Sequence, residues 1–185
     1  LNPNVIKEAR ELDKSIEKDN LLYGIPILIK DNINVKGLAT TAGASVFKNN
    51  YVDNNAFVIN KLKENNVLIL GKLNMSEWAY YFCRPCPVGY SSLGGQTLNP
   101  YGRKKFESGG SSSGSGVSIA ANYAMGSLGS ETSGSILSPS SNSSISYNSL
   151  TNSKSLCSNT ISFRVSKQKE NIFFSDIFFF SIYKI

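Results

Sequence analysis

Two short, uninterrupted apolar runs constrain the fold of this chain more than any other feature. The first, Ile-Pro-Ile-Leu-Ile, covers residues 25–29, and the second, Val-Leu-Ile-Leu, covers residues 67–70. Continuous apolar runs of this length are typical of strands that are buried on both faces. The segment between the runs predicts a helix that Asp53 caps and whose apolar positions are Phe57, Val58, Ile59 and Leu62. Strand, helix and strand with short connections indicate an α/β domain, in which helices flank a sheet.

Three further helices are expected. The first opens after Asn2-Pro3-Asn4 and places its apolar side chains at Val5, Ile6, Ala9 and Leu12. The second begins at Asn74, because Glu77 three residues on completes a capping-box pattern. The third covers residues 117–121, which are apolar enough for a buried helix behind a Gly/Ser turn.

The composition excludes several kinds of active site. The chain has 185 residues, a length that suggests one domain or most of one, and it contains no His. Neither Ser-His-Asp nor Cys-His catalysis is therefore available, and no zinc or haem site with His ligands can form. Hydrolytic chemistry would need Lys, Asp, Glu or Tyr as its base. We expect no metal and no cofactor.

The charge and the cysteines carry little functional signal. The net charge is +6, but the longest basic run is Arg103-Lys104-Lys105, so we expect no nucleic-acid partner. Cys83 and Cys86 form a CxxC that could be redox-active or half of a zinc site. A zinc site would need a second pair of cysteines and only Cys157 remains, while a redox role lacks a thioredoxin-like sequence context. We therefore assign the CxxC no chemical role. No apolar run approaches ~18 residues, so no membrane span is expected.

The composition divides the chain into three zones. Residues 1–107 have ordinary α/β sequence, and residues 108–141 are dense in Ser and Gly yet keep apolar positions that a flexible linker would not need. Residues 142–185 contain no Gly, Pro or Ala, and their clearest apolar feature is a cluster of Phe. We predict that residues 1–141 are the N-terminal part of a domain and that residues 142–185 form a poorly ordered tail.

Without His, a nucleophilic hydroxyl would need another base, and a desolvated Lys can serve as one. Lys30 follows the first apolar run, at the carboxyl end of a predicted strand, where open α/β sheets bind ligands. The simpler alternative is a solvated charge at the start of a loop. Two Gly/Ser turns, residues 109–114 and 132–135, offer hydroxyls and backbone N–H groups that could hold an anion or an oxyanion.

Together these segments resemble the amidase signature family. The resemblance covers roughly residues 1–141, and it implies the amidase signature fold, an α/β fold with a mixed, twisted sheet flanked by helices, left incomplete in this chain. Its main motifs are Gly24 to Asn32 (GIPILIKDN), Gly109 to Ser115 (GGSSSGS), Gly129 to Ile136 (GSETSGSI) and Pro139; shorter matching segments are residues 40–43, 70–77 and 95–100. Glu131 and the SSSGSG form look more like peptide-amidase-type members than like the glutamyl-tRNA amidotransferase A-type protein.

The resemblance implies an amidase that hydrolyses a carboxamide C–N bond through an acyl-serine, with a small-molecule or peptide amide as substrate. Ser135 would be the nucleophile, Ser111 a bridging serine after a cis peptide bond, and Lys30 the base. Ser112 would support this triad by hydrogen bonding. The oxyanion would be bound by the backbone N–H groups of Thr132, Ser133, Gly134 and Ser135.

Three departures from the family pattern leave alternatives open. Many members have Gly where this chain has Ser133, and Arg where this chain has Leu137. The Cβ of Ser133 would restrict the turn if the turn needs a positive φ at this position. Nothing after Ser141 resembles the family's continuation, so we expect a truncated copy. The alternatives are a non-catalytic remnant that only binds, and, within the family, a glutamyl-tRNA amidotransferase A-type protein.

Overall fold

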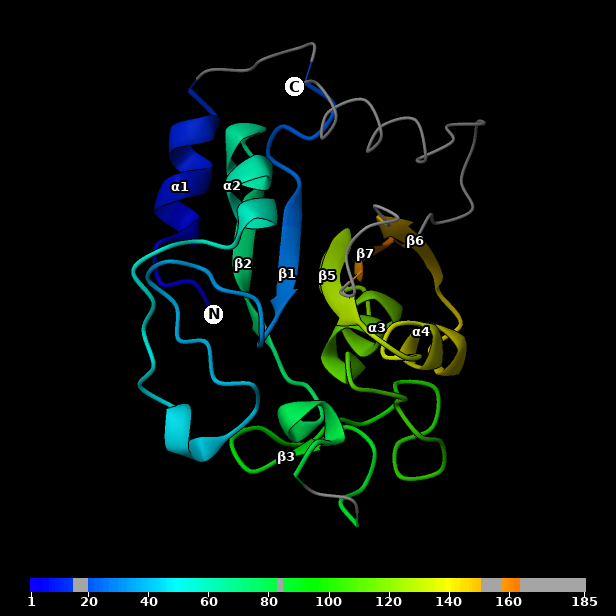
Figure 1. Ribbon diagram of the computed structural model, residues 1–185. Coiled ribbons are helices and arrows are strands. Elements are labelled where there is room, and N and C mark those ends of the chain that lie inside the picture. Colours follow the sequence, from blue (N-terminus) through cyan, green and yellow to red (C-terminus); the bar gives the residue numbers. More distant parts are fainter. Residues whose placement is uncertain (15–19, 83–84, 151–157, 164–185) are drawn as a thin grey trace.

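The computed structural model describes residues 1–14, 20–82, 85–150 and 158–163 (Figure 1). Its main sheet has the strand order β2-β1-β5-β7-β6, and a two-stranded sheet is made of β3 and β4. β1 pairs in parallel with β2 and with β5, whereas β7 pairs antiparallel with β5 and with β6. The sheet is therefore mixed, as predicted. The strands are β1 (Pro26–Lys30), β2 (Leu68–Leu73), β3 (Tyr90–Ser91), β4 (Gly95–Gln96), β5 (Gly126–Glu131), β6 (Ser146–Leu150) and β7 (Ser158–Phe163).

The predicted strand-helix-strand unit is present. β1 and β2 coincide with the two apolar runs, and α2 (Phe57–Glu64) connects them. The other α-helices are α1 (Val5–Leu12), α3 (Ser113–Ala120) and α4 (Leu137–Asn142), and two short 3-10 helices are η1 (Ser45–Phe47) and η2 (Glu77–Tyr80). None of the described helices has the length and apolar character needed to cross a membrane.

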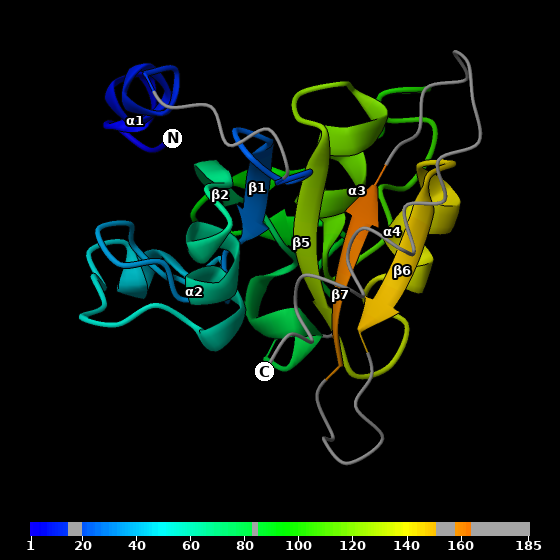
Figure 2. The ribbon, with the colours of Figure 1, turned by 90° about the horizontal axis from the view of Figure 1, so that it is seen from above.

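α2 and α3 cover opposite faces of the sheet. Ile59 and Leu62 of α2 belong to one buried cluster with Ile27, Ile29 and Leu128. α3 lies on the other face, where the hydroxyl of Ser127 donates to the backbone oxygen of Ser115. In Figures 1 and 2, α2 accordingly lies beside β1 and β2, and α3 and α4 lie beside β5 and β6. Because side chains alternate along a strand, Lys30 points to the opposite face from Ile29, which is the face that α3 covers.

Three details of the predicted helices differ in the structure. α1 buries none of its residues, and Ile6 is 62% exposed, because this helix lies on the outside of β2. Phe57 is 66% exposed, so only two of the four predicted apolar positions of α2 are fully buried. Residues 77–80 form a 3-10 helix rather than an α-helix, because Trp78 and Ala79 have left-handed backbone angles that a continuing α-helix cannot accommodate.

The zone after Ser141 contributes β6 and β7. The backbone of β7 pairs with all of β5, from Gly126 opposite Phe163 to Glu131 opposite Ser158. The poor order that the sequence predicts for residues 142–185 stays a prediction. Backbone N–H and C=O groups pair along an open strand edge whatever the side-chain pattern is. Residues 151–157 and 164–185, which include Cys157 and the Phe cluster, lie outside the described residues.

Two residues of α2 test the assignment of the core. Ile59→Ala removes a fully buried side chain, so we expect the free energy of unfolding to fall by ~2–5 kcal/mol. Phe57→Ala removes a larger but exposed side chain, whose ring lies 5.6 Å from the Lys61 ammonium, and it should cost no more than ~1 kcal/mol. Urea unfolding followed by circular dichroism measures both. Equal losses would contradict the placement of α2 on the sheet.

Candidate active site

A continuous chain of hydrogen bonds joins three residues that are distant in the sequence. The Nζ of Lys30 donates to Ser111 Oγ at 2.9 Å, and Ser111 Oγ lies 3.0 Å from Ser135 Oγ. Lys30 Nζ also donates a hydrogen bond to the backbone oxygen of Ser130, at 2.9 Å. The structure thus brings together the three side chains that the sequence predicts as a triad, and the peptide bond between Gly110 and Ser111 is cis.

The parallel pairing of β1 and β5 accounts for this convergence. Lys30 ends β1 and Glu131 ends β5, and parallel neighbours end at the same edge of a sheet. The turn that carries Ser135 follows β5 directly, so the nucleophile candidate lies at this edge. Ser111 reaches the same place from the loop that leads into α3, which packs on the face toward which Lys30 points.

Burial changes the acid–base character of Lys30. The side chain is 1% exposed, and desolvation lowers the pKa of its ammonium from 10.5 to about 7, although the negative charge of Glu131 works in the opposite direction. A lysine with such a pKa is neutral in a large fraction of molecules near pH 7. Lys30 can therefore accept a proton from a hydroxyl group.

Glu131 holds the turn that contains Ser135, a role that the sequence did not predict. Its carboxylate accepts the backbone N–H groups of Gly134 at 2.8 Å, Ile136 at 2.6 Å and Leu137 at 2.9 Å. Three charge-assisted hydrogen bonds fix the backbone on both sides of the nucleophile candidate. An acidic residue four positions before that serine was the available signal, but its side chain could have pointed to solvent.

Some backbone N–H groups of the predicted oxyanion-binding turn have no acceptor among the described residues. Within the described part of the chain, the N–H groups of Thr132, Ser133 and Ser135 donate to no acceptor. The N–H of Gly134, predicted as a further donor, is already bonded to Glu131. The positive φ of this turn, 79°, falls on Gly134 and not on Ser133, so the Cβ of Ser133 causes no strain there.

Ser112, predicted as a supporting residue, hydrogen-bonds to both sides of the site. Its N–H donates to the backbone oxygen of Ser135 at 3.0 Å. Its hydroxyl donates to the backbone oxygen of Ser130 at 3.1 Å and accepts the N–H of the same residue at 3.3 Å. Ser112 therefore ties the loop before α3 to the end of β5.

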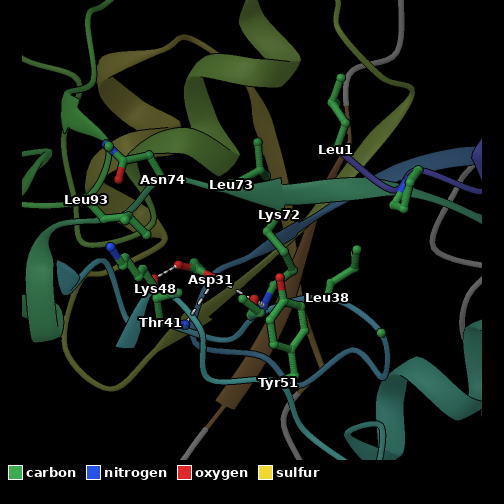
Figure 3. A pocket seen from close by; sticks show the side chains of 14 residues that line it. Leu1, Asp31, Leu38, Thr41, Lys48, Tyr51, Lys72, Leu73, Asn74 and Leu93 are labelled. Carbon is green, nitrogen blue, oxygen red and sulfur yellow. Dashed lines mark hydrogen bonds and ion pairs between the residues drawn. The ribbon is translucent and has the colours of Figure 1, made fainter. Parts of the chain in front are cut away.

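A cavity of about 480 Å³ lies beside the same edge of the sheet but is not lined by Lys30, Ser111 or Ser135 (Figure 3). The side chains of Asp31 and Lys72 reach into it and form a mostly buried ion pair of 3.2 Å. Burial lowers the pKa of Lys72, while Asp31 opposes this change. Lys72 also donates to the backbone oxygen of Ala39 and to Thr40 Oγ1, so this pair anchors residues 39–41 to β2.

The cysteines and the acidic residues form no metal site within the described ranges, where no three Cys, Asp or Glu side chains are grouped closely enough. Cys86 is disulfide-bonded, and Cys83 lies outside the described residues. The absence of a chemical role for the CxxC stays a prediction.

Comparison with known proteins gives consistent matches. Residues 1–146 match the family described as Amidase. A probable amidase of Arabidopsis thaliana is 41% identical over 150 residues, which make up 78% of this chain and 29% of that protein. A putative amidase of Schizosaccharomyces pombe is 38% identical over 143 residues, 75% of this chain and 24% of that protein.

A solved structure agrees with the sequence matches. The native peptide amidase of Stenotrophomonas maltophilia superimposes with a TM-score of 0.75 at 39% identity, over 80% of this chain and 31% of that one. The chain thus spans less than a third of the length of these relatives. The matched segment contains the Lys30, Ser111 and Ser135 constellation together with the strands that place it, and this chain belongs to the amidase (amidase signature) family.

Proposed function

We propose that this chain carries the acyl-transfer centre of an amidase, with Ser135 as the nucleophile, Ser111 as a proton relay and Lys30 as the base. The observation that supports this most directly is the unbroken hydrogen-bond chain from a desolvated lysine to a serine beside free backbone N–H groups. A lysine in this position does the work for which other hydrolases use His, a residue that this chain lacks.

The first half of the reaction forms an acyl-enzyme. Ser135 Oγ attacks the carbonyl carbon of the amide while its proton passes to Ser111 Oγ and the Ser111 proton passes to neutral Lys30. The hydroxyl hydrogens rotate freely enough to allow this direction of transfer. The oxyanion accepts hydrogen bonds from the free N–H groups of the turn 132–135. The C–N bond then breaks, and the Lys30 proton returns through Ser111 to the leaving amine.

The second half restores the enzyme. Water attacks the acyl carbon, its proton follows the same relay to Lys30, and the carboxylic acid leaves as Ser135 regains a proton. The substrate class is a small-molecule or peptide carboxamide, in keeping with the similarity to a peptide amidase. The alternative within the family is a glutamyl-tRNA amidotransferase A-type role, because such a protein of Pediococcus pentosaceus is 42% identical over 140 residues.

Covalent labelling tests the nucleophile without requiring a complete substrate pocket. A fluorophosphonate should phosphonylate Ser135 and release fluoride, and Ser135→Ala should abolish this labelling in intact-protein and peptide mass spectra. Ser141→Ala, at an exposed position on α4, is the matched serine control and should be labelled at the parent rate. Labelling that persists in Ser135→Ala would refute the assignment. Ammonia release from a simple primary amide then separates a working amidase from a non-catalytic remnant.

The base is tested by a pair of lysine substitutions. Lys30→Ala should slow labelling about 10²-fold or more, because neither serine then has a proton acceptor. Lys36→Ala replaces an exposed lysine six residues later and should leave the rate unchanged. The measurement is the labelling rate constant at pH 8. A similar small loss in both variants would mean that Lys30 is not the base.

The pH dependence follows from the pKa of Lys30. Labelling requires the neutral amine, so its rate should be low at pH 5.5, rise through a midpoint of about 7 and level off above that. Glu131→Gln removes the negative charge that raises this pKa, so the midpoint should move to lower pH. The measurement is the labelling rate constant of the parent and of Glu131→Gln at a series of pH values between 5.5 and 9. A midpoint near 10 would show that Lys30 is not desolvated.

A further inference from the structure

Ser76 lies directly against the segment that carries Ser111. It is 1% exposed, and its backbone N–H donates to the backbone oxygen of Ser111 at 3.1 Å. Its hydroxyl accepts the N–H of Gly89 at 2.9 Å. Ser76 therefore joins the loop before β3 to the bridging serine, although it touches none of the groups that exchange protons in the proposed reaction.

Tyr80 reinforces this contact from the end of η2. Its half-buried phenol oxygen and the Ser76 hydroxyl both lie beside the Gly110 backbone, and burial raises the pKa of the phenol. Trp78, Ala79 and Tyr80 have φ values of 50°, 52° and 72°. Consecutive non-glycine residues rarely adopt this left-handed conformation.

The two hydroxyl groups leave no space beside the residue before Ser111. A Cβ on Gly110 would overlap Tyr80 Oη and Ser76 Oγ. Gly110 does not have a positive φ, so its backbone angles do not require glycine. The restriction at this position is steric: the Tyr80 and Ser76 oxygens pack against the Gly110 backbone.

We propose that Tyr80 and Ser76 are positioning residues. Their hydroxyl oxygens pack against the backbone of the Gly110–Ser111 segment and thereby keep Ser111 Oγ between Lys30 Nζ and Ser135 Oγ. The inference rests on the proposed function, because it assigns Ser111 the relay role. The relay works only when Ser111 Oγ contacts Lys30 Nζ, at 2.9 Å, and Ser135 Oγ, at 3.0 Å, at the same time. Once the Tyr80 oxygen is removed, the segment has room to shift, and fewer molecules hold both contacts at once.

The test compares Tyr80→Phe with Tyr81→Phe, its neighbour, which is 80% exposed and contacts the ring of Phe82. Tyr80→Phe should slow fluorophosphonate labelling of Ser135 about 3- to 10-fold. It should also lower the pKa of Lys30, followed by NMR of its side chain, by about 0.3–0.5 pH unit, because a weaker bond to Ser111 stabilises the ammonium less. Tyr81→Phe should change neither, and both variants should keep the parent melting temperature within about 2 °C.

The two readouts separate this inference from the proposed function. If the parent is not labelled but Tyr80→Phe alone lowers the Lys30 pKa, the positioning role stands and the serine mechanism fails. If the parent is labelled and Tyr80→Phe matches Tyr81→Phe in rate and in Lys30 pKa, the positioning role is overturned.

A second variant applies if Tyr80→Phe unfolds. Gly110→Ala forces a methyl group against both oxygens, so it should reduce labelling and lower the Lys30 pKa more than Tyr80→Phe would. Combining it with Ser76→Ala removes one of the two overlapping oxygens and should restore part of each loss. A Gly110→Ala protein with the parent's rate and Lys30 pKa would overturn the inference.

Discussion

The burial of one lysine is the constraint that organises this site. An amine that is 1% exposed is costly to keep charged, and any polar group buried so deeply needs hydrogen-bond partners. Lys30 finds them in the backbone oxygen of Ser130, at the end of the neighbouring parallel strand, and in the hydroxyl of Ser111 before α3. Sheet, helix and loop must therefore all be in place before the lysine has its partners, so folding and the chemistry of the site are coupled.

Backbone groups carry much of the organisation around this lysine. Glu131 holds the turn after β5 through three N–H groups, and Ser112 and Ser76 hold the loop before α3 through further backbone contacts. Such bonds restrict where the neighbouring hydroxyls can lie without taking part in proton transfer. The negative charge of Glu131 has a second effect, since it raises the pKa of Lys30 against the larger effect of burial. One carboxylate thus influences both the geometry and the protonation of the proposed triad.

The sequence predicted the parts of the fold that depend on local pattern. The apolar runs at β1 and β2, the helix between them and the buried helix behind the first Gly/Ser turn are all present. It mispredicted features set by packing. Phe57 has the apolar character of a core residue but points outward, and the capping-box pattern at Asn74 leads into a 3-10 helix with left-handed residues. β7 was missed because it pairs through its backbone, for which side-chain periodicity gives no signal.

The amino-acid sequence alone limited the chemical possibilities: without His, a base had to come from another residue type, and the motifs around Lys30, Ser111 and Ser135 resembled one family. Which of these groups meet, how deeply the lysine is buried and which backbone donors stay free became visible in the folded chain. There Gly134 is engaged by Glu131, and Ser76 and Tyr80 pack on the bridging serine's loop. The physical reason is the separation along the chain: Ser111 lies 81 positions after Lys30 and 24 positions before Ser135. Distances between such residues are set by strand order and helix packing, which local sequence does not encode.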